Sequence, residues 1–347
     1  MIPVTVLTGF LGSGKTTLLA RLIRSPEFAR TAVIINEFGA VGIDHDLVEA
    51  SEESFVELET GCLCCTIRGD LEATLADLVA RRSRGIVPAF ERIVIETSGL
   101  ADPAPVLNAV MAEAGRGAGI MLDGVVTTVD AVTGAATLDR EPQSVRQVAV
   151  ADRLILTKTD LSDGAEADEA LARRLAALNP RAPVLVAIQG DIAPECLLGG
   201  GMMALAGGAP EVEAWLVADG AGFGSVNASR LDPARHDDGI VCLSLRRERP
   251  LPALVLTLLL EALADHCGAD LLRLKGLIHV AERPDQPAVV HGVQHVFHAP
   301  QWLERWPSAD RRSRFVLIGR GLSQIWVERL LDALEAEVAE VGAVETK

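Results

Sequence analysis

Short runs of β-branched and aliphatic residues recur along the first half of the chain, separated by longer segments with helical spacing of apolar positions. The runs lie at residues 4–7, 32–35, 55–58, 92–95, 124–129, 154–156 and 184–187. The helix-like segments lie at residues 15–24, 70–82, 105–114 and 166–178. Strands that are apolar throughout and alternate with helices indicate a mostly parallel sheet covered on both faces. The pattern therefore predicts a doubly wound α/β domain over residues 1–190.

Glycine-rich sequence interrupts this rhythm, and we interpret residues 191–238 as a linker region. A second pattern follows, with strand-like segments at residues 240–245, 272–281, 288–297 and 314–318 and helix-like segments at 252–266 and 323–341. These strands do not follow a regular strand-helix-strand order. We therefore expect a smaller α+β domain over residues 239–347.

Net charge and the lengths of the apolar runs argue against nucleic acids and membranes as partners. The net charge of -16 and the pI near 4.9 argue against a surface that follows nucleic-acid phosphates. The longest apolar run, residues 251–260, contains a proline and has half the length that a bilayer requires. The first residues carry no basic leader and already have the pattern of a buried strand. We therefore expect a cytoplasmic protein with no signal peptide, no membrane partner and no nucleic-acid partner.

The sequence G-F-L-G-S-G-K-T fits the Walker A pattern and lies directly between a predicted strand and a predicted helix. Glycines in such a loop allow backbone N–H groups to point inward around phosphates, and the helix N-terminus adds a positive dipole end. Lys15 is expected to reach the β- and γ-phosphates, and Thr16 to place its hydroxyl on Mg²⁺. The residues predicted to bind the phosphates are Gly9, Gly12, Ser13, Gly14, Lys15, Thr16 and Thr17.

A candidate reader of the nucleotide base follows a later strand. The segment Thr157-Lys158-Thr159-Asp160 stands where GTPases carry Asn-Lys-x-Asp. The Asp160 carboxylate can accept hydrogen bonds from two donors of guanine, whereas adenine presents an acceptor at the same place. Lys158 is expected to lie along the base. Because Thr157 replaces the usual Asn, we expect the amide contact to the base edge or to the phosphate loop to be lost, and affinity to be modest.

Acidic residues near two other strand ends are candidates for Mg²⁺ binding and hydrolysis. Glu96 ends an apolar strand at the Walker B position, where it can hold a Mg²⁺-bound water or orient the attacking one, and the Gly99 N–H is a candidate γ-phosphate sensor. Glu37 and Asp44 lie in a segment that we expect to act as the mobile switch over the triphosphate. For each of these two acids, a solvated loop position is an equally good interpretation.

Three of the six cysteines, Cys62, Cys64 and Cys65, occupy four successive positions. Three thiolates at this spacing can share one soft cation, and metal binding lowers their pKa values. A structural zinc knuckle requires a fourth close ligand, and no second Cys-x-x-Cys pair occurs in the chain. The segment therefore predicts a metal site with an open position, which suits transfer. Chance clustering of buried cysteines and a redox site remain as alternatives.

Taken together, these motifs give the chain a resemblance to the CobW-like family of metal-chaperone GTPases, relatives of the nickel-insertion GTPases of hydrogenase and urease maturation. The resemblance spans the GFLGSGKTT loop, the INEFG switch, the GCLCC segment, the ETSGLADP strand end, the VVTTVDA strand, the TKTD base reader and the C-terminal domain. It implies GTP hydrolysis coupled to the binding and transfer of zinc or cobalt, with Cys62, Cys64 and Cys65 as ligands.

The predicted function is thus a GTP-hydrolysing metallochaperone that uses GTP and Mg²⁺ and delivers Zn²⁺ or Co²⁺ to a client metalloprotein. Lys15, Thr16, Glu96 and Glu37 are the candidate catalytic residues, with Thr16 and Glu96 as the magnesium ligands. Two other functions stay open: a P-loop kinase acting on a small molecule, and a zinc-binding interaction protein that is independent of nucleotide. The oligomeric state also stays open, with a homodimer as one candidate.

Overall fold

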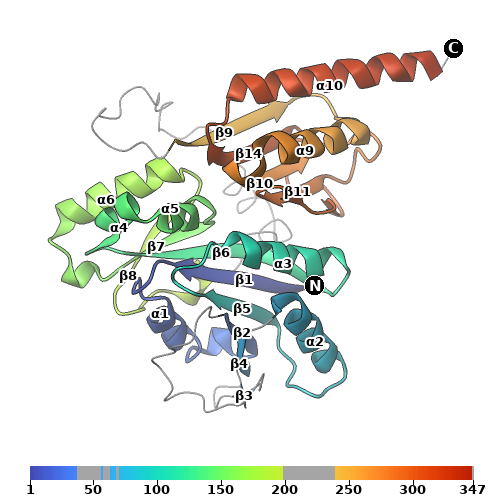
Figure 1. Cartoon of the computed structure of the whole chain (residues 1–347). Helices are drawn as coiled ribbons and strands as arrows, with labels where there is room; N and C mark the ends of the chain where they lie inside the picture. The colour runs from blue at the N-terminus through green and yellow to red at the C-terminus, as the bar shows by residue number, and fades with distance from the viewer. Residues whose placement is uncertain (37–55, 58–62, 68–69, 198–238, 346–347) are drawn as a thin grey trace. The chain divides into compact units, whose positions relative to one another are not determined.

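The computed structural model describes residues 1–36, 56–57, 63–67, 70–197 and 239–345. Residue contacts divide the chain into two compact units, Met1–Ala204 and Leu205–Lys347. Each unit has its own sheet, shown in Figure 1 in blue to green for the first and in orange to red for the second. The predicted fold class, an α/β unit followed by a smaller α+β unit, is confirmed.

The first unit is built on one eight-stranded sheet with the order β3-β4-β2-β5-β1-β6-β7-β8. Its strands are β1 (Ile2–Gly9), β2 (Thr31–Asn36), β3 (Val56–Glu57), β4 (Leu63–Ile67), β5 (Arg92–Thr97), β6 (Ile120–Asp130), β7 (Arg153–Thr157) and β8 (Val184–Ala187). Strand β3 pairs antiparallel with β4, and all other neighbours are parallel. The carboxyl ends of the parallel strands therefore meet at one edge, where open α/β sheets place their ligands.

Helices cover both faces of this sheet. They are α1 (Lys15–Leu22), α2 (Leu71–Ser83), α3 (Ala104–Gly115), α4 (Gly134–Arg140), α5 (Pro142–Ala149) and α6 (Ala165–Leu178), with short 3₁₀ turns at Pro26–Phe28, Thr159–Leu161 and Pro194–Cys196. Leu18, Leu19 and Leu22 of α1 pack against the central strands in one buried cluster. Because the crossover from β1 to β2 runs opposite to that from β5 to β6, right-handed connections place α1 and α3 on opposite faces (Figure 1).

Several elements differ from those that the hydrophobic pattern predicts. The segment between β6 and β7 was not assigned to any element, yet it forms α4 and α5. The cysteine segment continues into a strand, since Cys64 and Cys65 lie in β4. Ile192 and Leu197, in the segment that we interpret as linker, pack into the core of the first unit. The rest of the predicted linker, residues 198–238, lies outside the described residues.

The second unit is an antiparallel sheet with the order β12-β11-β10-β14-β9, and β13 pairs with β11. Its elements are β9 (Ile240–Arg247), α9 (Ala253–Cys267), a 3₁₀ turn (Gly268–Asp270), β10 (Leu271–Ile278), β11 (Ala288–Val293), β12 (Val296–Phe297), β13 (Gln301–Trp302), β14 (Ser313–Arg320) and α10 (Gln324–Glu345). Apolar side chains of α9 and α10 form one core with the inner face of the sheet. The single strand predicted over residues 288–297 is wrong, because Gln294 has a φ of 54° and the chain turns back there as a hairpin.

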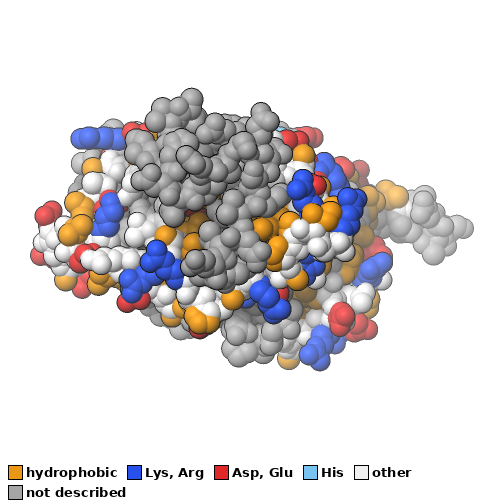
Figure 2. All heavy atoms as spheres, turned by 90° about the horizontal axis from the view of Figure 1, so that it is seen from below, with side chains coloured by type: hydrophobic (Ala, Val, Ile, Leu, Met, Phe, Trp, Pro, Cys, Tyr) orange, Lys and Arg blue, Asp and Glu red, His pale blue; other side chains and the backbone are white. Residues whose placement is uncertain are grey.

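The surface of the described residues carries charges of both signs. On the face shown in Figure 2, Lys and Arg side chains are interspersed with Asp, Glu and uncharged groups. No helix in the described part of the chain has the length and apolar character needed to cross a membrane.

Candidate functional site

The Walker A loop joins the end of β1 to the start of α1. Gly12 and Gly14 have φ values of 74° and 89°, a backbone region that residues with a Cβ rarely adopt. The buried Lys15 ammonium donates to the carbonyl oxygens of Gly9, at 2.9 Å, and Phe10, at 3.2 Å. The loop is therefore curled around the lysine side chain.

Thr16 and Glu96 come together although 80 positions separate them in the sequence. Thr16 Oγ1 donates to Glu96 Oε1 at 2.6 Å, and Glu96 is 5% exposed. A hydroxyl and a carboxylate are oxygen ligands of the kind that Mg²⁺ prefers. This donor set fits the magnesium site predicted for the two residues.

The loop after β5, residues 98–103, lies directly against the Walker A loop. A Cβ built on Gly99 would come within 2.6 Å of Leu11 Cα and 3.1 Å of Lys15 Nζ. Only glycine fits at this distance, so the predicted γ-phosphate sensor lies over the phosphate loop. Two residues before Gly99, at the end of β5, Thr97 Oγ1 donates to Thr8 Oγ1 at 2.8 Å and links the ends of β5 and β1.

The predicted base reader is anchored on the phosphate loop. Thr157 is buried, and its hydroxyl donates to the carbonyl oxygen of Ser13 at 2.8 Å. Contact with the phosphate loop is therefore not lost with the usual Asn, because the threonine hydroxyl makes it. Loss of the amide contact to the base edge stays a prediction. Lys158 has a φ of 59° and donates to Gly12 O at 2.7 Å. Asp160 is exposed and lies in the short 3₁₀ turn Thr159–Leu161.

Asp130, at the end of β6, is a site residue that the sequence analysis missed. Its Oδ2 accepts a hydrogen bond from Lys158 Nζ at 2.7 Å, and its Oδ1 accepts from the Val132 N–H at 2.8 Å. Burial raises the pKa of Asp130, but the hydrogen bonds from Lys158 and the backbone outweigh burial, and the pKa is lower than its usual value. Asp130 therefore stays ionised and holds Lys158. An aspartate at the end of an apolar strand was the signal available in the sequence.

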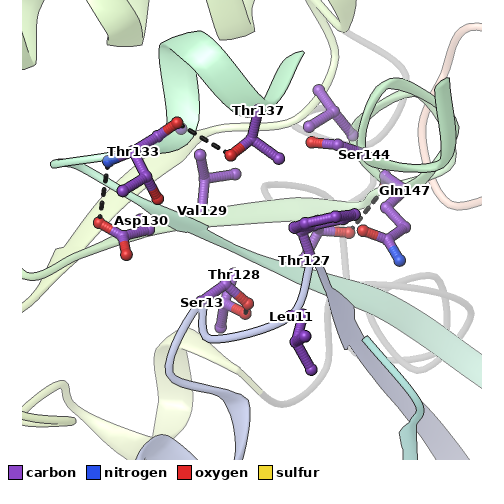
Figure 3. A pocket seen from close by; sticks show the side chains of 13 residues that line it. Leu11, Ser13, Thr127, Thr128, Val129, Asp130, Thr133, Thr137, Ser144 and Gln147 are labelled. Atoms are coloured by element: carbon purple, nitrogen blue, oxygen red, sulfur yellow. Dashed lines mark hydrogen bonds between the residues drawn. The ribbon is translucent and has the colours of Figure 1, made fainter. Parts of the chain in front are cut away.

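A small hollow lies beside the Walker A loop, between the end of β6 and helices α4 and α5 (Figure 3). Ser13 and Thr128 line it, and their hydroxyl oxygens lie 2.7 Å apart. The other lining side chains that carry hydroxyl, amide or carboxylate groups are Thr127, Asp130, Thr133, Thr137, Ser144 and Gln147. The hydrophobic pattern does not predict this polar wall, because it does not reveal α4 and α5 as helices.

The strand that carries Cys64 and Cys65 lies near the Walker B strand. Strand β4 pairs with β2 in register Ile34↔Cys65, and β2 pairs with β5 in register Ile34↔Ile95. Since neighbouring strands lie about 4.8 Å apart, the backbone of Cys65 is about 10 Å from that of Ile95, the residue before Glu96.

Some predicted ligands cannot be placed. Cys62, Glu37 and Asp44 lie outside the described residues, as do the side chains of the two cysteines in β4. Among the side chains that are described, His, Cys, Asp and Glu form no group of three that could hold a metal ion.

Comparison with known proteins matches both units. The nucleotide-binding domain described as CobW/HypB/UreG matches residues 3–186, and the C-terminal domain of the cobalamin synthesis protein cobW matches residues 240–335. The zinc chaperone YjiA of Escherichia coli is 33% identical over 92% of this chain and 94% of its own. The zinc chaperone CobW of Pseudomonas aeruginosa is 33% identical over 93% of this chain and 88% of its own.

A solved structure agrees with these matches. The crystal structure of the Zn(II)-bound YjiA GTPase from E. coli superposes with a TM-score of 0.69, at 29% identity, over 96% of this chain and 98% of that one. The family match covers more than half of the chain, and the predicted resemblance is confirmed. The chain therefore belongs to the family that is defined by the CobW/HypB/UreG nucleotide-binding domain and the cobW C-terminal domain.

Proposed function

We propose that this chain is a GTPase that binds zinc through Cys62, Cys64 and Cys65 and transfers it to a client metalloprotein. The observation that carries the proposal is the strand register, which puts the β4 cysteine strand two strands from the end of β5. At that end Glu96 accepts the Thr16 hydrogen bond. The relatives named zinc chaperones support zinc as the cargo. Cobalt is the second cargo that three thiolates would accept.

In this proposal the Walker A loop binds the triphosphate. Lys15 leaves the carbonyl oxygens of Gly9 and Phe10 and turns to the β- and γ-phosphates, while the N–H groups at the start of α1 point at the same oxygens. Thr16 and Glu96 would hold Mg²⁺, which neutralises phosphate charge when it is bound. Glu96 or Glu37 orients the attacking water.

Guanine would be read at the other end of the site. Thr157 and Lys158 are fixed on the carbonyl oxygens of Ser13 and Gly12, so the base reader and the phosphate loop form one hydrogen-bonded unit. Asp160 is exposed and follows directly, where its carboxylate can accept from the two guanine donors. Adenine would place an acceptor against this carboxylate.

Transfer requires that the nucleotide state changes the metal site. The segment between Asn36 and β4 contains Glu37, Asp44 and Cys62, so one stretch of chain would touch both the triphosphate and the metal. We infer that hydrolysis relaxes this stretch and lowers the affinity of the thiolates for zinc, which then passes to the client. The protein acts in the cytoplasm in this account, and its client is a metalloprotein.

The metal site is tested by titrating Co²⁺ into the GTP-loaded chain and recording the thiolate-to-cobalt absorption band. Cys64→Ala should abolish the band at one Co²⁺ per chain. Cys267→Ala, in the second unit, should leave the band unchanged. A full band in Cys64→Ala would overturn the assignment of the site. Rapid phosphorylation of added metabolites would instead favour a small-molecule kinase.

A further inference from the structure

Helix α5 contributes a buried amide to the loop that follows β5. Gln147 is 1% exposed, and its Nε2 donates to the carbonyl oxygens of Gly99, at 3.2 Å, and Ala101, at 3.1 Å. Its own backbone carbonyl accepts from Thr127 Oγ1 at 2.8 Å, which ties this part of α5 to β6. Gln147 therefore connects strand β6 to the loop that lies over the phosphate site.

The orientation of this amide is fixed by its surroundings. Two carbonyl oxygens face Nε2, so exchanging the amide oxygen and nitrogen would put three acceptors together. Gln147 Oε1 is buried, and among the described residues it has no hydrogen-bond partner. Burying an unsatisfied acceptor costs free energy. The side chain is thus placed for its two donor contacts.

Two backbone hydrogen bonds also support the start of this loop. The Ser98 N–H donates to Asn36 O at 2.9 Å, and the Ala101 N–H donates to Ser98 O at 3.2 Å. The second bond fixes the peptide plane that carries the Gly99 N–H. The Gln147 amide fixes two of the carbonyls that follow, those of Gly99 and Ala101, so the turn is held from both sides.

The neighbouring residue on α5 holds the far end of the same loop. Arg146 Nη1 lies 2.8 Å from Asp102 Oδ2, and Asp102 Oδ1 accepts from the Ala104 N–H, at 3.0 Å, where α3 begins. Arg146 and Gln147 therefore anchor the loop at two successive points. Because Gly99 is packed on Leu11 with no room for a Cβ, a small displacement of the loop changes what lies over the Walker A loop.

We propose that Gln147 is a positioning residue for the phosphate-sensing loop, and that it lets the site distinguish GTP from GDP. GDP requires the Walker A loop and the base reader, and the two side-chain hydrogen bonds of Gln147 go to neither of them. GTP adds a γ-phosphate, whose recognition depends on the loop that Gln147 holds. The inference rests on the proposed GTPase function and adds a residue outside all of its sequence motifs.

The test uses Gln147→Met in the full chain. Methionine keeps the length and the flexibility of the side chain and removes both donors. Affinities for a non-hydrolysable GTP analogue and for GDP are measured with fluorescent nucleotides, together with kcat, KM and Tm. We expect the affinity for the GTP analogue to fall about tenfold, as loss of two neutral hydrogen bonds predicts. GDP affinity should change less than about twofold, and kcat should fall about tenfold or more.

The matched control is Gln143→Met, one turn earlier on α5, which should retain the parent values. If Gln147→Met loses affinity for the GTP analogue and for GDP equally and has a lower Tm, its role is merely structural and the inference is overturned. An unchanged ratio of the two affinities would also overturn it. If Gln147→Met does not fold, Arg146→Met replaces it, because Arg146 is partly exposed. Arg146→Met should lower the affinity for the GTP analogue about threefold and leave the affinity for GDP unchanged. An unchanged ratio of the two affinities would again overturn the inference. A parent chain that binds no guanine nucleotide would instead remove the proposed function.

Discussion

Thr157 Oγ1 donates to the carbonyl oxygen of Ser13 at 2.8 Å, across 144 positions of sequence. This bond joins the end of β7, where the base reader begins, to the loop that surrounds the phosphates. A second bond, from Lys158 Nζ to Gly12 O, lies beside it. The two ends of the nucleotide site are therefore held in fixed relation by the protein itself.

Replacing Thr157 by Val should separate these two ends. The variant leaves the Ser13 carbonyl without its partner, at a cost of about 1 kcal/mol. We expect GTP and GDP affinities to fall together, each about fivefold to tenfold, because both nucleotides use the same loop. Equilibrium binding of fluorescent nucleotides measures this. Thr257→Val, in the second unit, serves as the control, and a loss confined to GTP would contradict the explanation.

Glu96→Gln should separate hydrolysis from nucleotide binding. The amide keeps the shape of the side chain but removes the charge that the Thr16 hydroxyl and Mg²⁺ would share. We expect kcat for GTP hydrolysis to fall about a hundredfold, while GDP binding without Mg²⁺ changes little. Phosphate release measures kcat, and Glu91→Gln, an exposed acid just before β5, is the control. Retained hydrolysis would exclude Glu96 from the catalytic role.

Asp160→Asn should change the preferred base. Xanthine carries a carbonyl where guanine carries an amino group, and an Asn amide can donate to that carbonyl. We expect the affinity for GTP to fall about a hundredfold or more. The variant should then bind XTP more tightly than GTP. Competition against a fluorescent nucleotide measures the two values. Asp163→Asn, three residues further along, is the control, and retained preference for GTP would mean that another residue reads the base.

The ion pair of Asp130 and Lys158 predicts a pH dependence of stability. The folded pKa of Asp130 lies below its unfolded value, so the pair is fully stabilising above the unfolded pKa, near 4. Its contribution disappears as the pH falls through the folded pKa. Solvent screening at the partly exposed Lys158 limits it to about 1 kcal/mol.

Asp130→Asn should therefore be less stable than the parent at pH 7 and approach it near pH 3. Urea unfolding at a series of pH values measures the difference in the free energy of unfolding. Asp139→Asn, which breaks the ion pair between the exposed Asp139 of α4 and Arg174 of α6, is the control and should show a smaller change. A constant difference between parent and Asp130→Asn at all pH values would contradict the ion-pair explanation.

The sequence predicted the parts of this protein that depend on local pattern. Apolar strands, the Walker A glycines and the acid at the end of β5 each carry their signal within a few residues. Helices α4 and α5 were missed because they are only seven and eight residues long and begin with Gly134 and Pro142, two residue types that are typical of loops. The contacts of Asp130 and Gln147 were missed for a different reason. They join segments far apart in sequence, and no local pattern specifies such pairs.

Measuring zinc affinity at fixed nucleotide state shows whether the nucleotide and the metal alter each other's binding, as we propose. Zinc is titrated into the full chain against a chelator of known affinity, once with a non-hydrolysable GTP analogue and once with GDP. We predict affinities that differ by about tenfold or more, and the same factor in nucleotide affinity with and without zinc, as linkage requires. Equal zinc affinity in the two states would contradict the account.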